Sequence, residues 1–112
     1  MQTKEFAEQT GLSAATLRYY EQEGLLRPER NANGYREYGA RDLEWVGFIL
    51  RLKDMGVPLA QIKEYARLRH LGDETVPERY RILQEPQAAL KQKRPELDAH
   101  REFLARKQEW YR

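Results

Sequence analysis

Apolar residues recur at helical spacing along most of the chain, and glycines or prolines separate the runs. The first run predicts a short helix that Thr3 caps and Gly11 ends, with Phe6 facing inward. A second helix follows almost at once, because Ser13 is a favourable N-cap and Gly24 a favourable C-terminal stop. Two short helices joined by a tight turn that contains glycine predict a helix-turn-helix.

The second helix lies within the segment TLRYYEQEGLL, and its residues divide between two faces. A period of 3.6 residues places Leu17 and Tyr20 on one face. Thr16, Arg18 and Tyr19 lie elsewhere and can face solvent or a ligand. An outward Arg-Tyr pair on a capped helix suits recognition of nucleic acid; the simpler alternative is an amphipathic helix whose charges are only hydrated.

The stretch after the second helix predicts a two-stranded wing. Asn33-Gly34 favours a tight hairpin turn because both residues tolerate positive φ. Arginines and tyrosines alternate around this turn. We expect Tyr38 to pack inward, and we expect Tyr35 and Arg36 to contact a nucleic-acid backbone. The alternative is a plain connecting loop.

Two longer helices follow the predicted wing. One is predicted over residues 40–55, where Gly56 ends it, and Pro58 opens the next. Their inward faces are Leu43, Val46, Ile49, Leu52 and Met55 in the first and Leu59, Ile62, Tyr65 and Ala66 in the second. We expect both helices to cover the helix-turn-helix.

The last forty residues carry an apolar residue at every seventh position. The members of this seam are Val76, Leu83, Leu90, Leu97, Leu104 and Tyr111. Such a repeat is typical of a dimerisation helix, and a mostly polar second column favours an antiparallel coiled coil between two copies. Pro86 and Pro95 predict a kink or break. The alternative is a helix that folds back on its own domain.

Composition narrows the function. The net charge is +2, divided into −1 for residues 1–56 and +3 for residues 57–112, so DNA binding must depend on local charge. The absence of cysteine excludes disulfides and thiolate metal sites. No apolar run near the start predicts a membrane span or a secretory signal, so we expect a cytoplasmic protein.

Catalysis and ligand binding are weaker hypotheses. The chain has no glycine-rich phosphate loop, and His70 and His100 are thirty residues apart, so we predict no enzyme, no cofactor and no metal. His70 with Asp73 is better explained as a hydrated helix end than as a metal site. Five aromatic residues could line a pocket between one subunit's tail and the other's domain, although core packing is the simpler explanation: Trp45, Tyr65, Tyr80, Trp110 and Tyr111.

Several motifs in a fixed order resemble the DNA-binding domain of MerR-family transcription regulators. They are EFAEQTGLSAATLRYYEQEGLL, NGYREY, RDLEWVGFIL and LKDMGVPLAQIKE, which span residues 3–69. The ending ARKQEWYR is similar to that of short members without a separate effector domain. The resemblance implies a mainly α fold, with a winged helix-turn-helix domain over residues 1–70 and a dimerisation helix over residues 74–112.

The resemblance also implies a function. A homodimer would bind a palindromic operator in double-stranded DNA and bend and untwist the promoter spacer for RNA polymerase. The DNA contacts carried over by position are Thr16, Arg18, Tyr19, Tyr20, Tyr35 and Arg36. The alternative function is an excisionase-like or architectural protein that bends DNA. The effector, the operator sequence, and the choice between activation and repression stay open.

Overall fold

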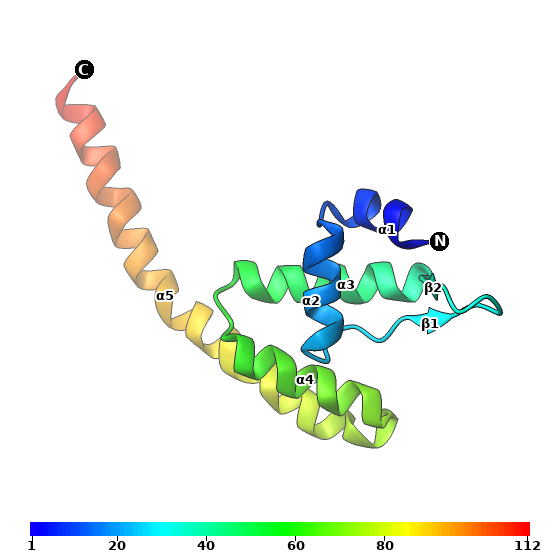
Figure 1. Cartoon of the computed structure of the whole chain (residues 1–112). Helices are drawn as coiled ribbons and strands as arrows, with labels where there is room; N and C mark the ends of the chain where they lie inside the picture. Colours follow the sequence, from blue (N-terminus) through cyan, green and yellow to red (C-terminus); the bar gives the residue numbers. More distant parts are fainter. The chain divides into compact units, whose positions relative to one another are not determined.

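The computed structural model describes residues 1–112, which divide into two compact units, residues 1–79 and residues 80–112. The first unit holds four helices, a two-stranded hairpin and a short 3-10 turn (Figure 1). A fifth helix begins in the first unit, and the rest of it makes up most of the second unit. The predicted mainly helical fold with a small hairpin is therefore confirmed. None of the helices combines the length and apolar composition that a bilayer crossing requires.

The helix-turn-helix consists of α1 (Thr3–Thr10) and α2 (Ala14–Gln22). Gly11 adopts φ 74° and donates its N–H to the carbonyl of Ala7, so it ends α1 as predicted. The predicted cap at Thr3 is wrong, because Gln2 has the extended backbone of an N-cap and Thr3 already belongs to the helix.

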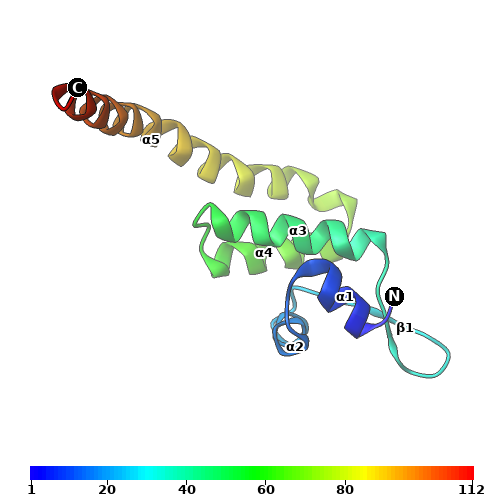
Figure 2. The same ribbon diagram turned by 90° about the horizontal axis from the view of Figure 1, so that it is seen from above.

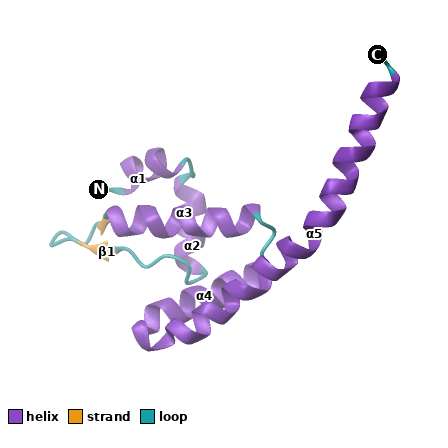
Figure 3. Cartoon of the chain, turned by 180° about the vertical axis from the view of Figure 1, so that it is seen from behind, coloured by secondary structure: helices purple, strands orange, loops and turns teal.

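The wing pairs β1 (Glu29–Arg30) with β2 (Arg36–Glu37) in antiparallel register, with Arg30 opposite Arg36. Figure 3 shows the loop of this hairpin projecting beyond the helices around it. Two like charges directly opposite each other destabilise a strand pair unless a counter-charge lies nearby. The hairpin therefore needs support from outside its own two strands.

The turn of the hairpin differs from the predicted one. Asn31 accepts from the N–H of Gly34 at 2.9 Å and donates its own N–H to the carbonyl of Tyr35 at 2.8 Å. Gly34 has φ 81°, whereas no residue other than glycine has positive φ anywhere in the chain. The loop is thus a type I turn followed by a bulged glycine, and of the two residues that tolerate positive φ only Gly34 adopts it.

Two longer helices complete the first unit, α3 (Ala40–Asp54) and α4 (Leu59–Leu71). Figure 1 shows α3 between α1 and α4, and Figure 2 shows the same helices from above; α3 packs against both α1 and α4. The Asp42 carboxylate accepts from the N–H of Gly39 at 2.9 Å and so supplies the cap that glycine lacks. Met55 and Leu59, predicted to face inward, are exposed because they lie where the chain reverses between the two helices.

The core of the first unit draws on all four helices of the unit and on the segments that connect them. Phe6 is fully buried and stacks on Tyr38 at 4.1 Å between ring centroids, which confirms the predicted packing of Tyr38. The indole of Trp45 donates to the carbonyl of Leu25, at the end of the helix-turn-helix. The other fully or nearly fully buried apolar side chains are Leu17, Tyr20, Leu25, Leu26, Val46, Ile49, Leu52, Ile62 and Ala66. This core holds α2 and the wing on a rigid support.

The fifth helix, α5 (Val76–Trp110), follows a 3-10 turn at Asp73–Thr75. It continues through Pro86 and Pro95 without interruption, so the predicted possibility of a break is wrong. Each proline removes only one N–H donor, and in a largely exposed helix water can bond to the carbonyl left free. The predicted kink stays a prediction.

Candidate nucleic-acid interface

Ser13 fixes the start of α2. Its hydroxyl oxygen accepts from the N–H of Thr16 at 3.0 Å, which satisfies one of the free amides of the first turn and confirms the predicted cap. The two hydroxyls of Ser13 and Thr16 also lie 2.9 Å apart in hydrogen-bond geometry. Thr16 is half-buried, and its hydroxyl is already hydrogen-bonded to Ser13 in the first turn of the helix.

The two faces of α2 have different environments, as its period predicts. Leu17 and Tyr20 are 1% and 2% exposed. Arg18 is exposed and makes no hydrogen bond or ion pair, and Tyr19 is 44% exposed. An unpaired guanidinium and a phenol side by side on an exposed helix face offer hydrogen-bond donors to a phosphate or a base edge.

Tyr20 serves mainly to hold α2 in place. Its ring is buried, its hydroxyl accepts from Lys53 Nζ of α3 at 3.3 Å, and the same ammonium lies 5.5 Å from the ring centroid. This contact agrees with the bracing role expected of Tyr20. The predicted contact of Tyr20 with a DNA backbone stays a prediction. Because the ring is buried, only the hydroxyl group of Tyr20 could make that contact.

Of the two predicted contact residues in the wing, Tyr35 is exposed and Arg36 is paired within the chain. Tyr35 follows the bulged Gly34 and is 63% exposed. Arg36 is half-buried, and its Nε donates to Glu21 Oε2 of α2 at 2.7 Å. The backbone contact predicted for Arg36 therefore has to compete with an ion pair inside the chain.

Glu21 is a residue that sequence reasoning missed. It binds Arg36, and its other oxygen lies 3.9 Å from Arg30 Nη2 on the opposite strand. Arg30 in turn donates from Nη1 to the carbonyl of Gly34. One carboxylate thus supplies the counter-charge for the two facing arginines of the hairpin and ties the hairpin to α2. The contact joins residues fifteen positions apart, so no local periodicity reveals it.

A second ion pair joins α2 to α4. Lys63 Nζ lies 2.5 Å from Glu23 Oε2. This hydrogen bond raises the pKa of Lys63, although partial burial acts in the opposite direction. Lys63 was also missed, because its charge fell outside the helix-turn-helix and wing motifs. It places a charged ammonium beside the end of α2.

His70 differs from the hydrated helix end that the sequence predicts. Its Nε2 is buried without a hydrogen-bond partner. Burial lowers the pKa of the imidazole; the charges of Arg27 and Arg69 lower it further, and a hydrogen bond with the backbone of Gly24 opposes them. No three metal-ligating side chains come together anywhere in the chain.

The capped helix with its exposed Arg18 and Tyr19, the tight turn before it and the tethered hairpin after it define a winged helix-turn-helix DNA-binding protein. A family model described as "MerR HTH family regulatory protein" matches residues 1–68, and a second, "MerR, DNA binding", matches residues 43–107. The chain belongs to the MerR family of DNA-binding transcriptional regulators.

Individual relatives agree with this assignment. The transcriptional regulator AdhR of Bacillus subtilis is 42% identical over 84 residues, which are 74% of this chain and 60% of AdhR. An uncharacterised HTH-type regulator of Haemophilus influenzae is 34% identical over 110 residues, 97% of this chain and 82% of that protein. The chain thus spans less than two thirds of AdhR. These relatives are named as transcriptional regulators, and the family is not enzymatic.

Solved structures with the same fold include one bound to DNA. HiNmlR, described as a MerR family regulator lacking the sensor domain, bound to promoter DNA, matches with a TM-score of 0.82 and 33% identity. The match covers 98% of this chain and 88% of HiNmlR. A regulator from Listeria monocytogenes matches with a TM-score of 0.78 and 34% identity over 95% of this chain and 79% of that one.

Proposed function

We propose that the chain acts as a homodimer on a palindromic promoter operator. Residues 1–70 would read DNA, and residues 74–112 would join two copies through an antiparallel coiled coil. DNA as the partner implies a cytoplasmic location. The observation that carries this proposal is the exposed apolar seam of α5, whose members are arranged every seven residues.

The seam has the chemistry of an unpaired coiled-coil face. Leu90, Leu97, Leu104 and Tyr111 are 46%, 59%, 57% and 71% exposed. Exposed apolar side chains in a continuous row are costly in water, and a second helix of the same kind would bury them. A dimer with two-fold symmetry presents two copies of α2 at a fixed separation, which matches two half-sites of an inverted repeat.

The DNA contacts we propose follow from the environments of the predicted residues. Arg18 is free to pair bidentately with guanine, whereas Tyr19 and Tyr35 offer hydroxyls to phosphates. Thr16, Tyr20 and Arg36 are partly engaged inside the chain, so their contribution is mainly to position the others.

Regulation would follow from deformation of the promoter. Bending and untwisting the spacer between promoter elements costs elastic energy, which contacts from two recognition helices and two wings can offset. Support for this comes from the family and from the promoter DNA bound to HiNmlR. RNA polymerase would then act on the realigned elements.

The substitution Leu97→Asp tests the dimer. A charge in the middle of the seam should convert the protein to a monomer in light-scattering measurements and abolish binding to inverted-repeat DNA. Amide hydrogen exchange should show that residues 1–79 stay folded. Gln92→Asp adds the same charge to α5 away from the seam and should leave both properties unchanged. A Leu97→Asp protein that still dimerises would overturn the proposal.

The excisionase-like alternative makes a different prediction at the promoter. Both proteins would bend DNA in a gel-mobility assay. Only a regulator changes the amount of transcript made by purified RNA polymerase from the cognate promoter, so an unchanged transcript level at saturating protein favours the architectural function.

A further inference from the structure

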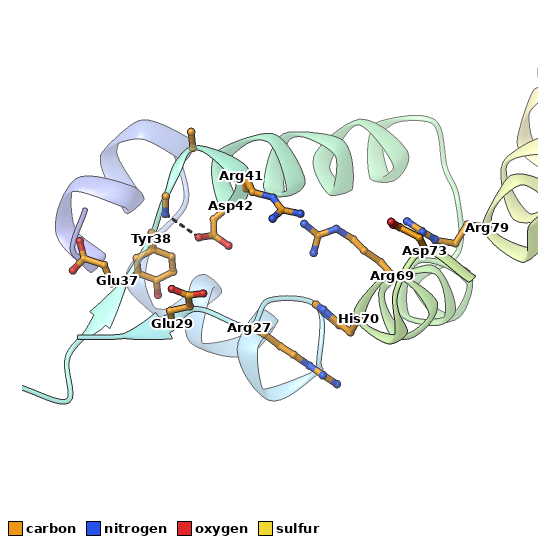
Figure 4. A pocket seen from close by; sticks show the side chains of 12 residues that line it. Arg27, Glu29, Glu37, Tyr38, Arg41, Asp42, Arg69, His70, Asp73 and Arg79 are labelled. Carbon is orange, nitrogen blue, oxygen red and sulfur yellow. Dashed lines mark hydrogen bonds between the residues drawn. The ribbon is translucent and has the colours of Figure 1, made fainter. Parts of the chain in front are cut away.

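Three arginines from three helices converge on one side of the first unit. Arg41 lies in the first turn of α3, Arg69 in the last turn of α4, and Arg79 in the first turn of α5. We call these three residues the arginine cluster. Its members line two cavities, one of about 720 Å³ and one of about 360 Å³. Figure 4 shows the guanidinium groups of Arg41 and Arg69 pointing toward one another.

No carboxylate forms an ion pair with the arginine cluster. None of the ion pairs in the chain involves Arg41, Arg69 or Arg79. The carboxylates that line the same cavities do not reach ion-pair distance of the cluster; they are Glu29, Glu37, Asp42, Glu44 and Asp73. Asp42 is bonded to the N–H of Gly39. Burial lowers the pKa of Arg69 first, and the charges of Arg41 and Arg79 lower it further, whereas Asp42 and, more weakly, Tyr65 oppose this shift. Like charges this close favour an anion between them.

Two of the three guanidiniums are held in position. Arg79 Nε donates to Thr75 Oγ1 at 3.1 Å, and its Nη2 donates to the carbonyl of Gly72 at 3.4 Å. The guanidinium carbon of Arg69 lies 4.3 Å from the ring centroid of Trp45. A group already fixed by its neighbours loses little entropy when it binds a ligand.

The smaller cavity adds three aromatic side chains. Trp45, Phe48 and Tyr65, here called the aromatic wall, lie within 5.2 to 5.9 Å of one another between ring centroids. They line the cavity together with the arginine cluster. Pockets for small organic molecules typically combine such an apolar wall with a few oriented polar groups and a volume of roughly 300–1,000 Å³.

We propose that the arginine cluster and the aromatic wall bind a small organic anion that carries both a carboxylate or phosphate group and a planar ring. The oxyanion accepts from the guanidiniums, and the ring packs on the wall. A DNA phosphate has no such ring to offer, so the wall favours a small molecule over the DNA backbone. The ligand would touch the start of α3, the end of α4 and the start of α5, and is therefore a candidate effector. This site does not depend on the proposed dimer or operator.

The test uses the full chain labelled with ¹⁵N and three probes. Phenyl phosphate supplies both groups, inorganic phosphate supplies the anion alone, and phenol supplies the ring alone. The indole N–H signal of Trp45, distinguished from that of Trp110 by a Trp110→Phe variant, reports binding. We expect phenyl phosphate to shift this signal saturably and to bind at least about tenfold more tightly than either of the other probes.

Two variants assign the binding to the cluster. Arg41 is exposed, so Arg41→Gln should keep the fold and weaken phenyl phosphate binding about tenfold. Arg51→Gln removes an exposed charge from the same helix outside both cavities and should leave binding unchanged.

Several outcomes would overturn the proposal. One is the absence of any Trp45 shift, as expected if a second copy covers the wall. Another is equal weakening by Arg41→Gln and Arg51→Gln. A third is a loss of DNA affinity in Arg41→Gln with a shallower salt dependence, which would make the cluster a DNA contact.

Discussion

Arg18 and Tyr20 stand two positions apart on α2 and have opposite environments. Arg18 is exposed and unpaired, whereas Tyr20 is buried with its hydroxyl bonded to Lys53. An exposed guanidinium without a partner retains all its donors for a ligand, and a buried phenol fixes the helix that carries it. We therefore expect Arg18 to contact DNA and Tyr20 to hold α2 in position.

Arg18→Ala should weaken specific binding and relax the sequence preference without unfolding the protein. Loss of a bidentate base contact costs about 1–3 kcal/mol, which is roughly tenfold to a hundredfold in affinity. Fluorescence anisotropy against the cognate operator and against random DNA measures the effect. Arg18→Lys keeps the charge but not the planar fork, so it should retain most phosphate attraction and lose sequence preference. Unchanged preference in both variants would remove Arg18 from base recognition.

His70 makes stability depend on pH. Its pKa is lowered in the folded chain by burial and by Arg27 and Arg69, so below about pH 6.5 the unfolded chain binds the proton more readily. The free energy of unfolding should therefore be highest above about pH 6.5, and it should decrease as the pH falls toward the pKa of His70 in the folded chain. Thermal melts of His70→Gln between pH 7.5 and 5 should show a smaller loss than the wild type. His100, exposed on α5, supplies the control, since His100→Gln should follow the wild type.

At the scale of elements, the contact between α2 and the wing depends on Glu21. Two strands of two residues each are marginal by themselves, and Arg30 faces Arg36 across them. Glu21 offsets this repulsion from the adjacent helix. The angle between wing and recognition helix is thus set by a side chain and by the burial of Tyr38 at the base of β2.

Glu21→Gln should loosen the wing while leaving α2 folded. The pair is about one third exposed, so its contribution is at most ~1 kcal/mol, or about fivefold in local opening. Amide hydrogen exchange across residues 29–37 should accelerate by that factor. Glu23→Gln removes the carboxylate that binds Lys63 and should not affect the hairpin. Equal protection of the hairpin in Glu21→Gln and the wild type would refute this account of the tether.

The sequence predicts elements well wherever a local rule applies. Ser13, Gly11 and Gly24 act within one turn of their own position, so the helix ends can be read from residue type. The hairpin turn was predicted in place but with the wrong geometry, because Asn33-Gly34 is compatible with two turn types and only the register of the strands decides between them.

Non-local features could not be predicted in the same way. The tether of Glu21 to Arg36 and the burial of His70 Nε2 depend on how separate elements pack. The arginine cluster comes from three helices with no shared motif. The uninterrupted path of α5 through Pro86 also departs from a local rule, since solvent can satisfy what the proline leaves unpaired.

At the scale of the whole molecule, one unit carries the proposed DNA-binding surface and the other carries most of the apolar seam. A monomer of this design exposes a row of apolar side chains and holds only one recognition helix. Two copies would bury the seam and present two recognition helices related by two-fold symmetry. The central claim is therefore that the protein reads DNA as a symmetric pair.

Selection of bound sequences from a randomised duplex library, followed by sequencing, tests that claim most directly. A symmetric dimer with two copies of α2 should enrich an inverted repeat whose half-sites have one fixed spacing, about one helical turn or a multiple of it between their centres. Enrichment of a single asymmetric half-site, or of no sequence at all, would contradict the account.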